Sequence, residues 1–327
     1  MNILDQARRD LELRTADIDQ YASYDPHEAG VLGIEEFLDS TKKHILMPES
    51  ERGIQLESQK TAEVFKARPG EFTVESGKQG CGKSARHTLR AMAFANQGQS
   101  SCICSMEMKP EETITRMFHQ FTGTVDPTIR LLEEMVDHFK GKVYLFSKVG
   151  SQGTKRILNL VKHCAANNIQ HLMIDSLMKC GVRSSDLDKL ETFANELQGL
   201  AKDLGVHIWL IAHQGKGHEG QTKEDGVRGS GMLLDLADNF ILYEKNERKF
   251  EVAAKQEMQK AIGEELTAKE KEILAYPDFY MEFRKQRHST VALPRKFGFW
   301  GHESMQFLPS EKALKLSNFD WMEGRTG

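Results

Sequence analysis

The stretch Gly77-Lys-Gln-Gly-Cys-Gly-Lys-Ser84 decides the fold, because it fits the pattern G-x-x-x-x-G-K-[ST] at every fixed position. Glycines let the backbone of such a loop bend tightly and turn its N–H groups toward phosphate oxygens. The lysine brings a positive charge to the β- and γ-phosphates, and the following hydroxyl can ligate Mg²⁺. The pattern predicts that the following residues bind the phosphates of a nucleoside triphosphate, taken as ATP: Gly77, Lys78, Gln79, Gly80, Cys81, Gly82, Lys83, Ser84 and Ala85.

The residues on either side of this loop support the same prediction. Residues 71–76 have the pattern of a β-strand, and residues 84–95 have that of a helix. A strand–loop–helix unit places the phosphates at a helix N-terminus, where unpaired N–H groups and the helix dipole favour anions. The stretch is therefore interpreted as the Walker A motif of a P-loop nucleotide-binding domain.

The composition narrows the class of protein. With 327 residues, 39% hydrophobic and 28% charged, the chain can form one large globular domain or one domain plus an extension. Its net charge of −4 means that any nucleic-acid site must be a local cluster of cations. Apolar runs of about 18 residues and a secretory leader are both missing from the sequence, which predicts a soluble cytoplasmic protein without membrane contact. Cys102 and Cys104 alternate in an expected strand, where packing is favoured over zinc binding.

The chain is expected to have three parts. Residues 1–52 form an N-terminal extension, 53–310 the ATPase domain, and 311–327 a C-terminal tail. In the extension, Ile34, Phe37, Leu38 and Ile45 share one face of a predicted helix that Met47-Pro-Glu-Ser ends. Two interpretations stay open: the helix folds onto its own core, or it is a linker that docks onto a neighbouring subunit.

Strands and helices alternate from about residue 55 onward, which is typical of a parallel sheet with crossover helices. Strands are predicted at 71–76, 101–106, 143–147, 170–176 and 207–212, and helices at 84–97, 110–121, 154–168 and 188–204. A second set of short strands at 239–243, 279–283, 290–293 and 305–308 is predicted to extend the sheet in antiparallel fashion. Within that set, the charged segment 247–275 is interpreted as a pair of surface helices interrupted by Gly263. The predicted fold class is α/β, with a mostly parallel central sheet, helices on both faces and an antiparallel C-terminal extension.

Two carboxylates follow predicted strands. His171-Leu-Met-Ile-Asp175 ends a buried strand in an acid, which in a P-loop protein is the Walker B pattern that holds Mg²⁺. Ser105-Met-Glu107-Met places a second acid at the same sheet edge. Lys109-Pro-Glu-Glu has its own helix-start chemistry, so Glu107 is not needed as a cap. Glu107 is therefore predicted to polarise the attacking water.

Two later segments carry further candidates. Trp209-Leu-Ile-Ala-His213-Gln ends a strand in a polar pair that can sense the γ-phosphate, although a structural histidine is the alternative. After a long glycine-rich loop, Arg228, Gly229, Ser230 and Gly231 offer a cation and backbone N–H groups suited to a nucleic-acid backbone, with a flexible turn as the alternative.

A pair of cations near the C-terminus can act across a subunit boundary. In Phe283-Arg-Lys285-Gln-Arg287-His, the lysine and arginine share one side of a strand or of its exit. Such a pair could neutralise transition-state charge on the γ-phosphate of a neighbouring subunit. The alternative is protection of an edge strand by cations.

The ordered motifs resemble those of a known family. They are the P-loop, Ser105-Met-Glu-Met-Lys-Pro-Glu-Glu-Thr113, Ile174-Asp-Ser-Leu-Met-Lys-Cys-Gly181, Ala212-His-Gln214, Val227-Arg-Gly-Ser-Gly231 with Asp235-Leu-Ala-Asp-Asn239, and Lys285-Gln-Arg287. This set resembles the ATPase domain of DnaB-type replicative helicases, most of all the bacteriophage and Twinkle-like branch, over about residues 50–308. The resemblance implies a RecA-like core, a hexameric ring, and ATP-driven translocation on single-stranded DNA, usually 5′ to 3′.

The resemblance also assigns roles to residues. It makes Lys83 and Ser84 the phosphate and Mg²⁺ residues, Glu107 the catalytic glutamate, Asp175 the Walker B acid and His213 the γ-phosphate sensor. It places Arg228, Gly229, Ser230 and Gly231 on the DNA-binding loop, and it makes Lys285 and Arg287 the trans-acting finger pair. His288-Ser289 stands where the family has Asn-Gly. Tyr243, near the end of an expected strand, is a candidate for the adenine contact and no more than that.

The expected function is that of an ATP-dependent replicative DNA helicase with ATP and Mg²⁺ as cofactors. Its expected partners are single-stranded DNA and further copies of itself, and a primase, a polymerase or a single-strand-binding protein are candidates. Nothing upstream of the ATPase motifs resembles a primase, so priming is expected on another chain. Two alternatives remain: a RecA-like recombinase or recombination mediator, and an accessory replisome subunit that holds nucleotide without turnover.

Overall fold

The chain consists of two compact units, residues 1–52 and 53–327. The computed structural model describes residues 33–47, 53–183, 186–213, 230–289 and 291–311. In the first unit, the short turn η1 (Ile34–Phe37) leads into α2 (Leu38–Leu46), which ends before Met47 as predicted. The apolar side chains predicted to share a face are all exposed, at 88% for Ile34 and 65% for Ile45.

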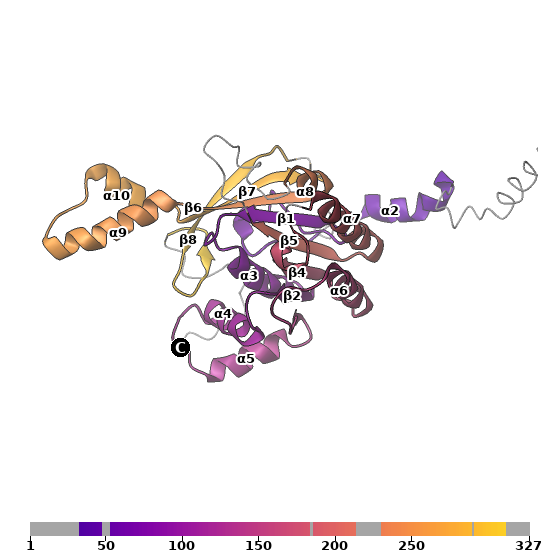
Figure 1. The fold of residues 1–327 in the computed structure, drawn as a ribbon, viewed down its shortest axis with the longest axis horizontal. Helices are drawn as coiled ribbons and strands as arrows, with labels where there is room; N and C mark the ends of the chain where they lie inside the picture. The colour runs from indigo at the N-terminus through magenta and orange to yellow at the C-terminus, as the bar shows by residue number, and fades with distance from the viewer. Residues whose placement is uncertain (1–32, 48–52, 184–185, 214–229, 290, 312–327) are drawn as a thin grey trace, which may run out of the picture. The chain divides into compact units, whose positions relative to one another are not determined.

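A single sheet organises the second unit, and its order is β3-β2-β4-β5-β1-β6-β7-β8-β9 (Figure 1). The strands are β1 (Phe72–Gly77), β2 (Ser101–Ser105), β3 (Val143–Leu145), β4 (His171–Asp175), β5 (His207–His213), β6 (Asn239–Lys245), β7 (Phe279–Gln286), β8 (Arg295–Gly301) and β9 (Phe307–Leu308). Strands β1 to β6 pair in parallel, and β6 to β9 pair in antiparallel fashion. The predicted α/β class, a mostly parallel sheet with an antiparallel C-terminal part, is confirmed.

Helices cover both faces of this sheet, again as predicted. On one face lie α3 (Lys83–Asn96), α4 (Pro110–Thr122) and α5 (Arg130–Phe139). On the other lie α6 (Thr154–Ala166), η3 (Leu177–Lys179), α7 (Leu187–Leu204) and α8 (Ser230–Leu236). The remaining turn η2 (Gln59–Thr61) precedes β1.

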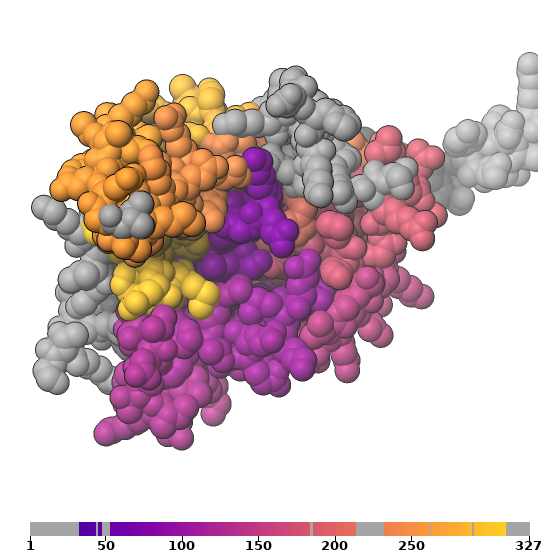
Figure 2. Space-filling view, turned by 60° about the vertical axis from the view of Figure 1, so that its left-hand side comes forward, coloured from indigo at the N-terminus to yellow at the C-terminus, as the bar shows by residue number. Residues whose placement is uncertain are grey.

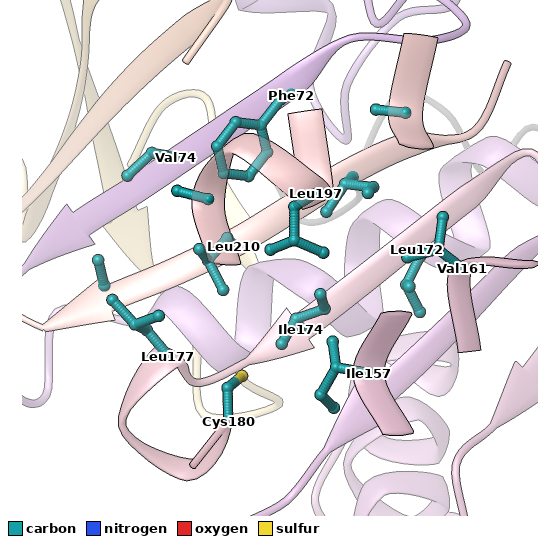
Figure 3. Packing of buried hydrophobic residues seen from close by; sticks show 14 of the residues in the cluster. Phe72, Val74, Ile157, Val161, Leu172, Ile174, Leu177, Cys180, Leu197 and Leu210 are labelled. Atoms are coloured by element: carbon teal, nitrogen blue, oxygen red, sulfur yellow. The ribbon is translucent and has the colours of Figure 1, made fainter. Parts of the chain in front are cut away.

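Alternation along each strand divides the core between the two faces. Phe72 and Val74 of β1 point to the α6–α7 side, where Leu172 and Leu210 of the neighbouring strands join them (Figure 3). Trp209 directly precedes Leu210 on β5, so its side chain points to the opposite face, the α3 side. Because both faces are buried, β4 and β5 are nearly continuously apolar between their ends, which is typical of parallel sheets, whereas β1 buries Thr73, Glu75 and Ser76.

Two details of the strand prediction are wrong. Strand β6 pairs in parallel with β1, so the antiparallel part begins only at β7. The long connection from β5 to β6, which contains α8, provides the crossover that parallel pairing needs. Residues 291–293 form no strand, because Pro294 interrupts the ladder and pairing starts at Arg295. The sequence analysis also missed α5.

The predicted surface helix pair between β6 and β7 is present. Helix α9 (Glu247–Ile262) ends at Gly263, whose φ of +75° suits glycine, and α10 (Ala268–Leu274) starts with a capping box on Thr267. The pair stands away from the sheet (Figure 1), and in Figure 2 its orange surface adjoins a purple patch of residues early in the second unit. The exposed ion pair Lys78–Glu247, at 3.1 Å, joins the start of α9 to the Walker A loop.

The cysteines pack in the core, as the sequence predicts. All five cysteines are buried free thiols, and Cys102 and Cys104 pack in the core as predicted. Within the described ranges, no helix combines the length and the apolar character needed to cross a bilayer.

Two buried histidines predict how stability depends on pH. His207 Nδ1 donates to the Arg68 carbonyl (2.7 Å), its Nε2 accepts from the Thr73 hydroxyl (2.8 Å), and burial lowers its pKa to about 3. Burial also lowers the pKa of His171. The folded state keeps these rings neutral while the unfolded chain takes up protons near pH 6.5, so stability falls as the pH drops from about 6.5 toward 3.

The test is urea unfolding between pH 7 and pH 4. For each such histidine, the free energy of unfolding should fall by up to about 1.4 kcal/mol per pH unit below pH 6. His207→Gln should reduce that slope relative to the wild-type chain. Parallel pH curves for the two proteins would contradict the prediction.

Candidate nucleotide-binding and catalytic site

The Walker A residues form one continuous turn between β1 and α3. The turn leaves the sheet at Gly77 and enters the helix at Lys83. Gly80 and Gly82 have φ angles of +78° and +89°, which side chains rarely adopt. A Cβ on Gly82 would lie 2.3 Å from the Phe307 ring, so β9 also packs against this loop. The predicted residues 77–85 thus lie together, with their backbone shaped by glycine.

Lys83 lies over the loop that it follows. Its Nζ donates to the carbonyls of Gly77 (2.6 Å) and Lys78 (2.8 Å), and the side chain is buried. A lysine in this position brings its charge to the concave side of the loop, where phosphate oxygens bind in P-loop proteins. The arrangement therefore fits a triphosphate.

Three predicted side chains meet at the carboxyl end of the sheet. Strand register places Ser105 opposite Asp175 and Gly77 opposite His213. One ligand atom from each of Glu107, Asp175 and His213 lies within 4.8 Å of the others. In an open α/β sheet, ligands bind at this edge. The sequence prediction that Glu107 and Asp175 share one edge is confirmed.

Glu107 does not cap helix α4, as the sequence indicated. The N-terminus of α4 is capped by Glu112, whose carboxylate accepts from the Lys109 N–H at 2.9 Å. Glu107 lies 3.9 Å from His213 Nε2 and accepts from the Ser176 hydroxyl at 3.4 Å, and its side chain is 44% exposed. Its carboxylate is therefore accessible to solvent, at the same edge of the sheet as the Walker A loop.

Asp175 has the surroundings expected of a cation ligand. It is 4% exposed, and its Oδ1 has no hydrogen-bond partner within the described structure. An unpaired buried carboxylate oxygen costs free energy unless a cation compensates it. The donor set of Ser84 and Asp175 fits Mg²⁺, which prefers oxygen ligands.

Sequence reasoning missed Arg116 of α4. Its half-buried guanidinium interacts electrostatically with Asp175 and Glu112, and desolvation lowers its pKa. Thr113, Met117 and Gln120 mark the inward face of α4, and Arg116 lies next to that face. An arginine next to the buried face of an expected helix is the sequence feature that could have identified this residue.

The two predicted finger residues, Lys285 and Arg287, lie toward the other end of the sheet. Arg287 N donates to Asp238 O, and Asp238 N donates to Phe72 O, so Arg287 is next to the first residue of β1. Gly77, at the last residue of β1, is about 16 Å further along the strand. Arg287 is therefore placed away from the P-loop of its own chain. Strand β7 lies between β6 and β8, but its pairing with β8 ends at Phe283, so the edge-protection alternative stays open.

Lys285 and Arg287 both contact the C-terminal end of α8. Lys285 Nζ donates to the carbonyls of Leu234 (2.6 Å) and Asp235 (3.0 Å), and Arg287 donates to Asp235 O (3.1 Å). Arg287 also pairs with Asp238 at 3.2 Å. Their predicted placement on one side is confirmed. Burial and the nearby Arg287 lower the pKa of Lys285.

The predicted DNA-binding loop is only partly described. Arg228 and Gly229 lie outside the described residues. Ser230 and Gly231 begin α8, so the predicted grip would continue directly into the helix that Lys285 and Arg287 contact.

Tyr243 is not available to an adenine ring, so that candidate is wrong. Its side chain is 1% exposed, its hydroxyl donates to Glu75, and it accepts from Arg90 (2.9 Å). Arg90 in turn pairs with Glu75 (2.7 Å) and Glu57 (3.1 Å). Tyr243 belongs to a buried ionic network that joins β1, α3 and β6.

Comparisons with known proteins agree with this architecture. No protein-family model matches the chain. The chain is similar to the DNA helicase/primase of Enterobacteria phage T3, at 23% identity over 213 residues, which cover 56% of this chain and 36% of the relative. It therefore spans about a third of that relative's length.

Solved structures show the same fold. A solved ATPase domain matches with a TM-score of 0.64 and 15% identity, over 84% of this chain and 98% of that one. A DnaB-like replicative helicase, solved in a study of its interactions with primase, matches with a TM-score of 0.64 and 14% identity, over 93% and 76% of the two chains. This protein has the RecA-like fold of the ATPase domain of DnaB-like helicases.

Proposed function

We propose that the protein is an ATP-dependent replicative DNA helicase that works in the cytoplasm as a hexameric ring and unwinds duplex DNA 5′ to 3′. The observation that carries the proposal is the meeting of Glu107, Asp175 and His213 at the sheet edge where the Walker A loop lies. The DnaB-like fold and the similarity to a phage helicase/primase support it.

Residues of one chain would bind the triphosphate and Mg²⁺ and activate the attacking water. Lys83 binds the β- and γ-phosphates, and Glu107 accepts a proton from the attacking water. His213 donates to the γ-phosphate and responds to its loss. Ser84 and Asp175 would hold Mg²⁺, which neutralises phosphate charge when bound.

A neighbouring subunit would complete the site. Lys285 and Arg287 lie far from their own P-loop, which supports a role in trans. In a ring they would reach the γ-phosphate of the next subunit, and Arg228–Gly231 from each copy would line a central pore. The exposed apolar face of α2 suits the linker alternative, in which it docks on the next subunit.

Replisome partners belong to the same proposal. The phage relative is named as a helicase/primase, and the DnaB-like structure was solved in a study of its interactions with primase. We propose a primase as the first partner to test, with a polymerase and a single-strand-binding protein as further candidates.

The proposal is tested by ATP turnover with and without single-stranded DNA. Turnover should rise on adding DNA, and Lys83→Ala should abolish it because the β- and γ-phosphates lose their cation. The mass measured with an ATP analogue and single-stranded DNA should be that of a ring. Nucleotide binding without turnover would instead support the accessory-subunit alternative.

A further inference from the structure

Three side chains at the proposed γ-phosphate position bring an unusual set of donor atoms together. Two are carboxylates, Glu107 and Asp175, and the third is the imidazole of His213. Their ligand atoms lie within 4.8 Å of one another, and Glu107 Oε1 is 3.9 Å from His213 Nε2. Three ligands spaced evenly around one small divalent ion, at about 2.1 Å from it, lie about 3.6 Å apart, so shifts of about an ångström would bring this set around an ion.

A second observation points to a cation at the same place. Asp175 is 4% exposed, and its Oδ1 lacks a hydrogen-bond partner within the described residues. Arg116 is the nearby cation that acts on Asp175 electrostatically, yet it leaves this oxygen without a hydrogen bond. A divalent ion would supply the missing partner.

The nitrogen ligand sets the preference among metals. Mg²⁺ favours oxygen ligands and retains its waters, whereas imidazole favours first-row transition metals. The Ser84 and Asp175 pair offers oxygen only. The set of Glu107, Asp175 and His213 is mixed, and it needs no phosphate oxygen to reach three protein ligands.

We propose that Glu107, Asp175 and His213 form a divalent-metal site that binds Mn²⁺ in the absence of nucleotide and prefers it to Mg²⁺. The inference deepens the proposed function, on which it rests for the role of this sheet edge in catalysis. It adds a metal preference that His213 determines. A glutamine at this position would keep a polar side chain but remove the ring nitrogen.

The test is Mn²⁺ titration of the metal-free full chain without nucleotide, followed by electron paramagnetic resonance of the free ion. We expect one bound Mn²⁺ per chain and displacement by Mg²⁺ only at more than about tenfold higher concentration. His213→Gln should weaken Mn²⁺ binding at least about tenfold, and Asp175→Asn should abolish it. Mn²⁺ should raise the melting temperature of the wild-type chain, and this rise should vanish in His213→Gln.

Controls separate this inference from the proposed function. His163→Gln, at an exposed position on α6, should bind Mn²⁺ like the wild-type chain, and circular dichroism should verify that every variant is folded. Absence of nucleotide-free Mn²⁺ binding, or equal affinity in His213→Gln, would overturn the inference even where ATP turnover is intact. Mn²⁺ binding in a chain that never hydrolyses ATP would support the metal site and count against the helicase.

Discussion

Arg287→Ala should lower DNA-stimulated ATP turnover by about 10³-fold or more, and mixing it with Lys83→Ala should restore a fraction of the activity. An arginine that neutralises transition-state charge on a phosphoryl group contributes a factor of that size. Each variant alone has every site defective. In a mixed ring, some interfaces pair an intact Lys83 with an intact Arg287, so turnover returns as mixed assemblies form.

The contacts of Arg287 within its own chain call for a matched control. Arg287 donates to Asp235 O and pairs with Asp238, so its removal can loosen the end of α8. Arg284→Ala makes the same charge change three residues earlier, within β7, where Arg284 pairs with Glu282. It should keep most of the turnover, and thermal unfolding of both variants measures the structural cost. Full activity of Arg287→Ala as an isolated monomer would refute the trans role.

Glu107→Gln should lower kcat by about 10²- to 10⁴-fold while ATP-analogue binding is retained. The substitution keeps the size of the side chain but removes the carboxylate that takes the proton from water. Because Glu107 neither caps α4 nor lies in the core, the fold should remain intact. Single-turnover hydrolysis and equilibrium binding of the analogue measure the two quantities separately.

The neighbouring acid Glu111 provides the control for that experiment. It lies exposed in the first turn of α4, so Glu111→Gln changes the same charge close to the site. Its kcat should stay within about twofold of the wild-type value. A Glu107→Gln variant with wild-type kcat would remove Glu107 from catalysis and leave nucleotide holding as the function.

Local sequence patterns predicted the strand-end residues well. Asp175 and His213 follow apolar runs, and parallel strands bring such ends to one edge. The parallel pairing of β6 could not be predicted in this way, because direction depends on the crossover path and not on the composition of the strand. Tyr243 failed as an adenine contact for a related reason. Its burial depends on Glu75 and Arg90, which come from distant segments.

The position of Lys285 depends on a β-bulge in β7, which the alternation of residues in the sequence does not predict. Strand pairing shifts between Phe240 and Ile241, so Lys285 is opposite Phe240 and Phe283 is opposite Ile241. The extra residue is Arg284. In an unbroken strand Lys285 would share the buried face of Phe283, whereas the bulge turns it toward the end of α8. Alternation alone cannot reveal such a shift.

We propose that the protein is an ATP-driven motor that moves along one DNA strand and so unwinds the duplex. Unwinding of a forked duplex, with either the 5′ or the 3′ single-stranded tail blocked, tests it most directly. Strand displacement should require ATP and stop when the 5′ tail is blocked, while a block on the 3′ tail should leave it unchanged. ATP turnover without strand displacement on any fork, together with strand exchange between homologous duplexes, would contradict the helicase and identify a recombinase.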